Sequence, residues 1–191
     1  MIPEYRYSPE TRGWIEVICG SMFSGKTEEL IRRLKRSQFA KQHIATFKPD
    51  TDKRYDDFKV VSHQGTELLS QAIGSSKDLL RLCGEAKVLG IDEAQFFDME
   101  LPEVAQHLAN KGLRVIIAGL DLDYKGEPFG PMPQLMAIAE YVTKVHAICM
   151  RCGSLAYVSH RKSNTKELVL LGETEAYEPL CRTCFNLEKI H

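Results

Sequence analysis

The stretch between residues 14 and 40 decides the fold. It opens with an apolar run, Trp14-Ile15-Glu16-Val17-Ile18-Cys19, and continues into the loop Gly20-Ser21-Met22-Phe23-Ser24-Gly25-Lys26-Thr27. From there to residue 40, Leu30, Ile31 and Leu34 recur at helical spacing among arginines and lysines, which predicts an amphipathic helix. The loop fits the pattern G-x-x-x-x-G-K-[ST], and a strand before it and a helix after it are the context in which that pattern binds phosphate.

Each residue type in this loop has a chemical reason. Gly20 and Gly25 let the backbone turn, so that successive N–H groups can point at an anionic phosphate chain near the positive end of the following helix. Lys26 adds a mobile positive charge for the terminal phosphates, and the hydroxyl of Thr27 is placed to coordinate Mg²⁺. The loop is therefore a candidate nucleoside triphosphate site, and a glycine-bearing turn that happens to carry a lysine is the alternative.

Length and composition narrow the class of protein. A chain of 191 residues can form one α/β domain with a core and a small appendage. Its hydrophobic content of 43% and charged content of 27% are typical of globular proteins. A net charge of −1 gives no electrostatic reason to expect binding to nucleic acid or to a membrane. Because there is no apolar run near 18 residues and no signal peptide, we expect a cytoplasmic location.

Strands and helices alternate along the rest of the chain. Strands are predicted at 43–48, 58–62, 87–93, 113–119 and 142–148, and helices at 75–83, 101–110 and 134–141. This alternation is typical of a parallel sheet covered by helices on both faces, here an α/β fold of the P-loop NTPase type. We expect three parts: an N-terminal arm at 1–13, a P-loop α/β domain at 14–148 and a C-terminal domain at 149–191.

Two acids end the apolar run that begins at residue 87. Asp92 stands where a carboxylate can serve the Mg²⁺ of a bound nucleotide. Glu93 beside it can orient an attacking oxygen and accept its proton. That oxygen could belong to a substrate hydroxyl or to water, so the pair alone does not separate a kinase from an ATPase, and two solvated acids at a strand end are the alternative. A GTPase is unexpected, because Leu113 stands where its Asn-Lys-x-Asp motif needs an acid.

Four cysteines form two C-x-x-C pairs near the C-terminus, Cys149 with Cys152 and Cys181 with Cys184. In a chain without a secretion signal, such pairs indicate a metal before disulfides. Four thiolates close a tetrahedral Zn²⁺ site and leave no open position, so the predicted zinc is structural. The long span between the pairs must fold back as a ribbon, with candidate strands at 157–159 and 167–170 and a turn at 163–164. Unliganded core thiols or a redox pair are the alternatives.

Several motifs in this order resemble the cytosolic type II thymidine kinases. Besides the phosphate loop and the paired cysteines, they are Asp92-Glu93-Ala94-Gln95-Phe96-Phe97, Gly119-Leu120-Asp121 and Pro128-Phe129-Gly130. The resemblance implies transfer of a phosphoryl group from ATP, with Mg²⁺, to the 5′-hydroxyl of thymidine. It also implies a small-molecule substrate and a homotetramer.

The resemblance also implies roles for single residues. Glu93 would be the base, Asp92 and Thr27 would serve Mg²⁺, and Gln95 and Asp123 would lie near the nucleotide. The implied nucleoside contacts begin with Met22 at the thymine methyl group, Phe96 against the ring, and Asp52 and Arg54 toward the sugar and phosphates. A loop braced by the zinc ribbon would cover the nucleoside through Leu168, Leu170, Leu171, Gly172 and Tyr177. Glu173 departs from the Gly-Gly that the family often carries at this place.

Two other functions compete with this reading of the sequence. An ATPase coupled to nucleic acid would use the ribbon as a binding module and would gather basic and aromatic side chains there. The ribbon instead carries Glu167, Glu173, Glu175 and Glu178 among its basic residues. A catalytically idle zinc-binding scaffold would leave the phosphate loop and the acid pair unexplained. A phosphotransferase acting on a small molecule fits best.

Overall fold

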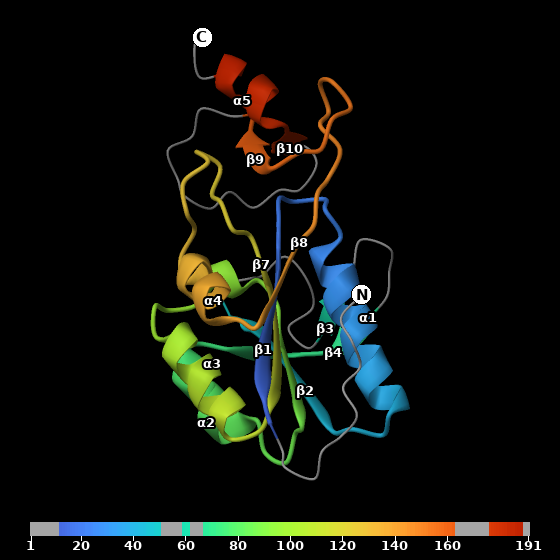
Figure 1. Ribbon diagram of the computed structural model, residues 1–191, viewed down its shortest axis with the longest axis vertical. Coiled ribbons are helices and arrows are strands. Elements are labelled where there is room, and N and C mark those ends of the chain that lie inside the picture. Colours follow the sequence, from blue (N-terminus) through green and yellow to red (C-terminus); the bar gives the residue numbers. More distant parts are fainter. Residues whose placement is uncertain (1–11, 51–58, 62–66, 163–175, 189–191) are drawn as a thin grey trace.

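The computed structural model describes residues 12–50, 59–61, 67–162 and 176–188. Its centre is a sheet of six strands in the order β5-β2-β6-β7-β1-β8, which Figure 1 shows running through the lower part of the molecule. Every strand pair in this sheet is parallel. The strands are β1 (Trp14–Cys19), β2 (Ile44–Pro49), β5 (Gln71–Ile73), β6 (Val88–Ile91), β7 (Arg114–Gly119) and β8 (Tyr141–Lys144).

Helices cover both faces of this sheet. Helix α1 (Lys26–Phe39) lies on one face, and α2 (Leu79–Leu82), α3 (Leu101–Asn110) and α4 (Met132–Ile138) lie on the other (Figure 1). Neighbours in a strand point to opposite faces, and Val17 and Ile18 are both completely buried. Ile18 packs in a cluster with Leu30 and Leu34 of α1, whereas Val17 belongs to the core on the opposite face. The predicted α/β fold with a doubly covered parallel sheet is confirmed.

A smaller lobe follows β8 and lies at the top of Figure 1. Its hairpin pairs β9 (Val158–Arg161) with β10 (Tyr177–Leu180) in antiparallel fashion, and α5 (Arg182–Glu188) follows. We call the described residues from 146 to 188 the ribbon. The strand predicted at 167–170 lies outside the described residues, and β9 pairs with β10 in its place.

Other short elements complete the described chain. A hairpin joins β3 (Lys59–Val61) to β4 (Glu67–Leu69). Single 3₁₀ turns lie at η1 (Ser76–Asp78) and η2 (Ala94–Phe96). The segment predicted as one helix at 75–83 is thus a 3₁₀ turn followed by a short α-helix, because the hydroxyl of Ser75 caps the N–H of Lys77 and tightens the first turn.

Two predicted boundaries shift in the second half of the chain. The helix predicted at 134–141 is α4, which begins at Met132 and ends at Ile138, because Pro133 is tolerated in a first helical turn. The last strand, predicted at 142–148, is β8, which begins and ends earlier. The N–H of Val145 still bonds to the carbonyl of Cys19 before the chain leaves for the ribbon.

A buried ion network ties β1 to its neighbours. Glu16 in β1 is completely buried and accepts hydrogen bonds from Arg33 of α1 at 2.8 Å and Arg114 of β7 at 2.6 Å. The indole N–H of Trp14 donates to the same carboxylate at 2.7 Å. Because the carboxylate has three donors, its burial is compensated. The network therefore fixes the orientation of the strand and the helix that flank the phosphate loop.

We find no helix among the described residues that combines the length and the apolar character needed to span a membrane.

Candidate active site and zinc site

The candidate site lies where parallel strands of the sheet end. The phosphate loop follows β1, Asp92 and Glu93 follow β6, and the segment from Leu120 follows β7. Since β6, β7 and β1 are neighbours in the sheet, their carboxyl ends meet at one edge. This edge is where open α/β sheets bind their ligands.

The backbone of the phosphate loop depends on its two glycines. Gly20 has φ +144°, and a Cβ there would lie 2.1 Å from the carbonyl oxygen of Val145. Gly25, with φ +84°, caps the N-terminus of α1 in the left-handed region. Phe23, between them, also has a positive φ of 62°, a strained conformation for a residue with a side chain. Any larger residue at position 20 would force the loop away from the strand end.

The side chains of the loop and of the acid pair come close together. The ammonium group of Lys26 donates to the carbonyl oxygen of Ser21 at 2.7 Å, and the hydroxyl of Ser24 donates to the same oxygen at 2.7 Å. The hydroxyl of Thr27 donates to Oδ2 of Asp92 at 3.2 Å. The two residues predicted to serve Mg²⁺ thus come from α1 and from the end of β6, and each presents an oxygen of the kind that Mg²⁺ binds.

Asp92 has an unusual environment for a carboxyl group. Its burial, with the charge of Glu93 beside it, raises the pKa of Asp92 to about 7, although the N–H of Glu93 and the ammonium group of Lys26 act in the opposite direction. Shifted pKa values of this kind cluster at functional sites. A divalent cation would favour the charged carboxylate, so the donor set fits a bound magnesium ion.

Hydrogen bonds restrain both the backbone and the side chain of Glu93. Its φ of +51° places it in the left-handed region, and its N–H donates to Oδ1 of Asp92 at 2.9 Å. The amide nitrogen of Gln95 donates to Oε2 of Glu93, and the amide oxygen of Gln95 accepts from the N–H of Leu120 at 2.9 Å. Gln95, predicted beside the nucleotide, is therefore a buried link between Glu93 and the end of β7.

Two aromatic rings pack against each other, one of them in the 3₁₀ turn that follows Glu93. Phe96, predicted to stack on a base, meets Phe129 edge to face, with ring centroids 5.6 Å apart and planes at 89°. A Cβ at Gly130 would lie 2.3 Å from the carbonyl oxygen of Gln95, so only glycine lets the segment 128–130 pack this closely. Phe129 has no role in the prediction from the sequence, although the Pro128-Phe129-Gly130 motif was the signal that could have found it.

Tyr177 is the one described member of the predicted covering loop. It is buried, and its hydroxyl accepts from Arg161 at 2.7 Å. The guanidinium group of Arg161 also lies over the ring of Tyr124, at 3.9 Å from its centroid. Arg161 therefore connects the ribbon to the segment that follows β7. The remaining predicted contacts lie outside the described residues: Asp52, Arg54, Leu168, Leu170, Leu171 and Gly172.

Asp123, predicted near the nucleotide, organises its own turn. Its Oδ1 accepts from the N–H of Lys125 at 2.8 Å and from the N–H of Glu127 at 3.0 Å. Its backbone N–H donates to the carbonyl of Glu127 at 2.8 Å. In the structure these contacts shape the loop that leads to Phe129.

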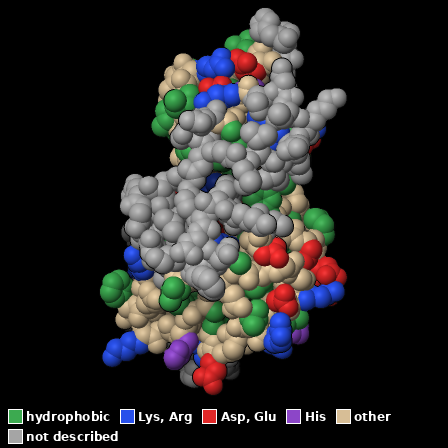
Figure 2. Space-filling view, turned by 180° about the vertical axis from the view of Figure 1, so that it is seen from behind, with side chains coloured by type: hydrophobic (Ala, Val, Ile, Leu, Met, Phe, Trp, Pro, Cys, Tyr) green, Lys and Arg blue, Asp and Glu red, His purple; other side chains and the backbone are tan. Residues whose placement is uncertain are grey.

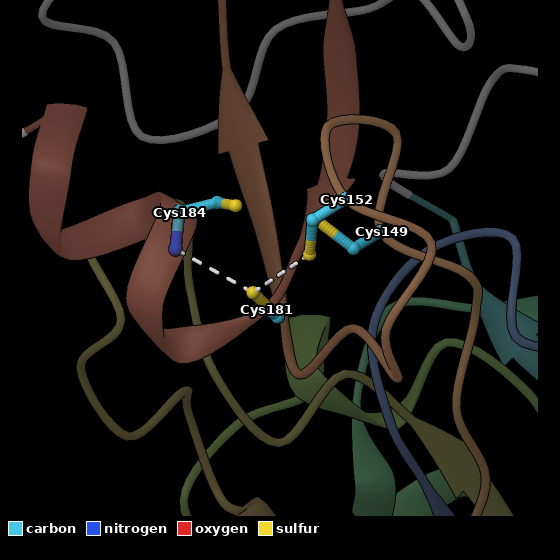
Figure 3. Close-up of side chains that lie close together, drawn as sticks. All are labelled: Cys149, Cys152, Cys181 and Cys184. Atoms are coloured by element: carbon cyan, nitrogen blue, oxygen red, sulfur yellow. Dashed lines mark hydrogen bonds between the residues drawn. The ribbon is translucent and has the colours of Figure 1, made fainter.

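The four cysteines of the ribbon converge, as Figure 3 shows. Their sulfur atoms, from Cys149, Cys152, Cys181 and Cys184, all lie within 4.8 Å of one another, and Cys152 and Cys181 are 3.5 Å apart. Four sulfurs around one Zn²⁺ at about 2.3 Å would lie about 3.8 Å from one another. The Ser154 hydroxyl and N–H lower the pKa of Cys152 to about 6, whereas the neighbouring sulfurs of Cys181 and Cys152 raise the pKa of Cys184 to about 12. A bound Zn²⁺ would favour the thiolate form of all four cysteines. The cluster fits a structural zinc ion.

One contact between the ribbon and the phosphate loop was not predicted from the sequence. The N–H of Met22 donates to the hydroxyl of Ser159 in β9 at 2.8 Å, although the two residues are 137 positions apart. Nothing in the local pattern around Ser159 marks it as a partner of the loop. The ribbon and the candidate nucleotide site are thus in direct contact.

Comparison with known proteins agrees with this geometry. A model of the thymidine kinase family matches residues 13–185. A thymidine kinase from Bacteroides thetaiotaomicron is 62% identical over 91% of this chain and 87% of its own length. Thymidine kinases from Rhodothermus sp. and Porphyromonas gingivalis are 58% and 57% identical, over 91% of this chain and 81% and 85% of their own lengths. The chain therefore belongs to the thymidine kinase family.

Proposed function

We propose that this chain transfers the γ-phosphoryl group of ATP to the 5′-hydroxyl of thymidine and so produces dTMP. Membership of the thymidine kinase family supports the substrate and the reaction class. The contact between Thr27 and Asp92, with Glu93 next in the chain, supports the chemistry, because it joins a phosphate loop to a carboxylate that can accept a proton.

The phosphate loop would bind the donor. Its backbone N–H groups and Lys26 would hold the β- and γ-phosphates, with Lys26 leaving the carbonyl oxygen of Ser21. Thr27 and Asp92 would hold Mg²⁺, which supplies positive charge against the phosphate oxygens. The residues between the two glycines would maintain the conformation of the loop around the phosphate chain: Ser21, Met22, Phe23 and Ser24.

Glu93 would accept the proton of the 5′-hydroxyl as the oxygen attacks the γ-phosphorus. Gln95 would act as its positioning residue, because its amide N–H donates to one oxygen of the Glu93 carboxylate and so orients the carboxyl group. Phe96 would lie against the thymine ring, with Phe129 supporting it. Tyr177 and the predicted residues at 168–172 would cover the nucleoside and exclude water, so that phosphoryl transfer to water is suppressed.

Several broader features belong to the same proposal. The zinc is structural and braces the covering loop, and the acceptor is a small molecule. The chain divides into an arm at 1–13, a catalytic domain at 14–148 and a ribbon domain at 149–191. On the face that Figure 2 shows, acidic and basic side chains of the described residues are interspersed, which suits a small-molecule enzyme better than a nucleic-acid-binding ATPase. We keep the homotetramer and the cytoplasmic location as predictions.

A single assay separates the kinase from an ATPase. The observation that carries the proposal is the position of Glu93, which can serve either a sugar hydroxyl or water. ADP production is measured with ATP and Mg²⁺, with and without thymidine. We expect turnover that needs thymidine and forms one dTMP per ADP, whereas equal ADP production without thymidine would contradict the proposal.

A further inference from the structure

The zinc-bearing ribbon touches the phosphate loop at two adjacent residues. The hydroxyl of Ser159 accepts from the backbone N–H of Met22 at 2.8 Å, and Ser159 is only 3% exposed. The neighbouring side chain of Phe23 packs against the apolar core of the ribbon. That ribbon core is made of Ala147, Cys149, Ala156, Val158, Leu180, Cys181 and Phe185.

The same ribbon core contains two of the four cysteines. Cys149 and Cys181 are buried members of the cluster against which Phe23 packs. A change in the position of these cysteines therefore reaches Phe23 through van der Waals contact, because packed interiors transmit displacements. On the other side of the loop, the N–H of Val145 donates to the carbonyl oxygen of Cys19 at 2.8 Å. Val145 is the last residue before the ribbon.

The loop needs this support because of its own backbone. Phe23 has φ +62°, which costs free energy for a residue with a side chain and persists only where the surroundings hold it. The packing of its ring against the ribbon core and the bond from Met22 to Ser159 are two such restraints on consecutive residues. Without them, the loop would relax toward conformations in which its N–H groups no longer converge on a phosphate chain.

We propose that the ribbon holds the phosphate loop in its nucleotide-binding conformation, and that Ser159 is a positioning residue for ATP. The zinc site would then support the donor site as well as the cover over the nucleoside. This inference rests on the proposed ATP site in the loop. It concerns nucleotide affinity in the absence of thymidine, which the covering loop does not explain.

The test measures binding of MgADP to the full chain without thymidine, by calorimetry. The variant Ser159→Ala removes the acceptor of the Met22 N–H, and Ser159→Thr keeps a hydroxyl. Tyr157→Phe is the matched control, because it removes a hydroxyl from the ribbon and leaves the ring that packs against Phe185. We expect Ser159→Ala to raise the Kd for MgADP about tenfold, the scale of a lost hydrogen bond to a buried donor. Tyr157→Phe should stay within about twofold. Ser159→Thr keeps the acceptor but adds a methyl group at a buried position, so it should raise the Kd less than Ser159→Ala does.

Zinc content and melting temperature are measured on the same samples, so that a change in affinity is not mistaken for loss of the ribbon. An unchanged Kd in Ser159→Ala with zinc retained would overturn the inference. So would a rise in the KM for thymidine alone, because Ser159 would then act on the nucleoside and not on the loop. If the unaltered chain failed to bind MgADP, the proposed ATP site itself would be wrong.

Linkage supplies a second readout that does not depend on activity. If the ribbon supports the loop, bound nucleotide must in turn stabilise the ribbon, since coupling between two sites is reciprocal. We expect MgADP to slow the transfer of zinc to a coloured chelator severalfold in the unaltered chain. In Ser159→Ala this protection should be lost at saturating MgADP. Equal rates with and without MgADP in the unaltered chain would contradict the coupling.

Discussion

Glu93 combines a strained backbone with a side chain that accepts a hydrogen bond from Gln95. The variant Glu93→Gln keeps the size of the side chain and can still accept the hydrogen bond from Gln95. Because an amide cannot accept the proton of the 5′-hydroxyl, we expect kcat to fall about 100-fold or more. At pH 8, where Asp92 is mostly charged with or without the charge of Glu93, the Kd for MgADP should stay within about twofold, because the phosphate loop is untouched.

The matched control for this variant is Glu85→Gln, which makes the same change at an exposed acid. Its kcat and Kd should equal those of the unaltered chain. Steady-state kinetics and calorimetry provide the two measurements. Full turnover in Glu93→Gln would exclude Glu93 as the base.

Asp92 makes nucleotide binding depend on pH. Burial and the charge of Glu93 raise its pKa to about 7, so the carboxyl group is largely protonated below that pH. Mg²⁺ binds the carboxylate, and the affinity for MgADP should therefore rise as the pH increases through 7. We expect binding at pH 6.5 to release a proton, which calorimetry in two buffers of different ionisation enthalpy detects. In Asp92→Asn the release should disappear, and a heat independent of buffer in the unaltered chain would refute the assignment.

The sequence identified those site residues whose partners lie in the same short motif. The spacing of Gly20, Gly25 and Lys26 is local, so the phosphate loop could be recognised without a fold. Ser159 could not, because its contact with Met22 is created by the docking of a separate lobe. The hydrogen bond between Gln95 and Leu120 could not be predicted for the same reason, because it joins the ends of two strands that are neighbours only in the folded sheet.

At the scale of the element, β1 depends on its buried carboxylate. Burial by itself would raise the pKa of Glu16, but the hydrogen bonds and charges of Arg114, Trp14 and Arg33 outweigh it and lower that pKa below the ordinary value. A lowered carboxyl pKa stabilises the folded state above the ordinary pKa of about 4.5 and loses this stabilisation as the pH falls through the folded value. The network therefore stabilises the packing of β1 against α1 and β7, and it weakens in acid.

The variant Glu16→Gln tests this network. It leaves Arg33 and Arg114 beside a neutral group, and we expect the free energy of unfolding at pH 7 to fall by about 3 kcal/mol. Because the unaltered chain loses this stabilisation in acid, the difference between the two should shrink toward pH 3. Urea unfolding followed by the fluorescence of Trp14, the single tryptophan, gives both values. Glu103→Gln, at an exposed site on α3, is the control, and an equal loss there would contradict the prediction.

Elements with strong periodicity were predicted best. The bounds of α3 and β1 agree with the prediction residue for residue, because a proline in the first turn marks the start of α3 and a glycine ends β1. The short elements were predicted less well. In η1 and α2, a serine cap and tertiary contacts decide between α and 3₁₀ geometry, since Asp98 also accepts hydrogen bonds from Ser75 and Ser76.

At the scale of the whole molecule, the zinc site holds the ribbon together. The ribbon has a small apolar core, and small units need a metal or another cross-link for stability. The variant Cys152→Ser should lower zinc affinity and make residues 149–188 unfold before the sheet domain. Limited proteolysis followed by mass spectrometry should then show early cleavage in this range, together with a raised KM for thymidine. Cys83→Ser, outside the cluster, is the control, and equal resistance of the two variants to protease would argue against a zinc-stabilised ribbon.

Tyr177 tests whether the ribbon serves the nucleoside directly. Its ring is held by Arg161, which also lies over Tyr124 from the sheet domain, so the tyrosine stands where the two lobes meet. Tyr177→Ala removes the ring and should raise the KM for thymidine about tenfold, because aromatic contact with a base is lost. The KM for ATP should change less than twofold, since Ser159 and Phe23 still hold the phosphate loop. Tyr177→Phe keeps the ring and removes only the hydroxyl that accepts from Arg161, so it separates stacking from positioning. If the KM of Tyr177→Phe for thymidine stays close to that of the unaltered chain, the effect of Tyr177→Ala comes from the ring. If Tyr177→Ala raises the KM for ATP and for thymidine equally, Tyr177 stabilises the contact between the lobes and does not contact the nucleoside.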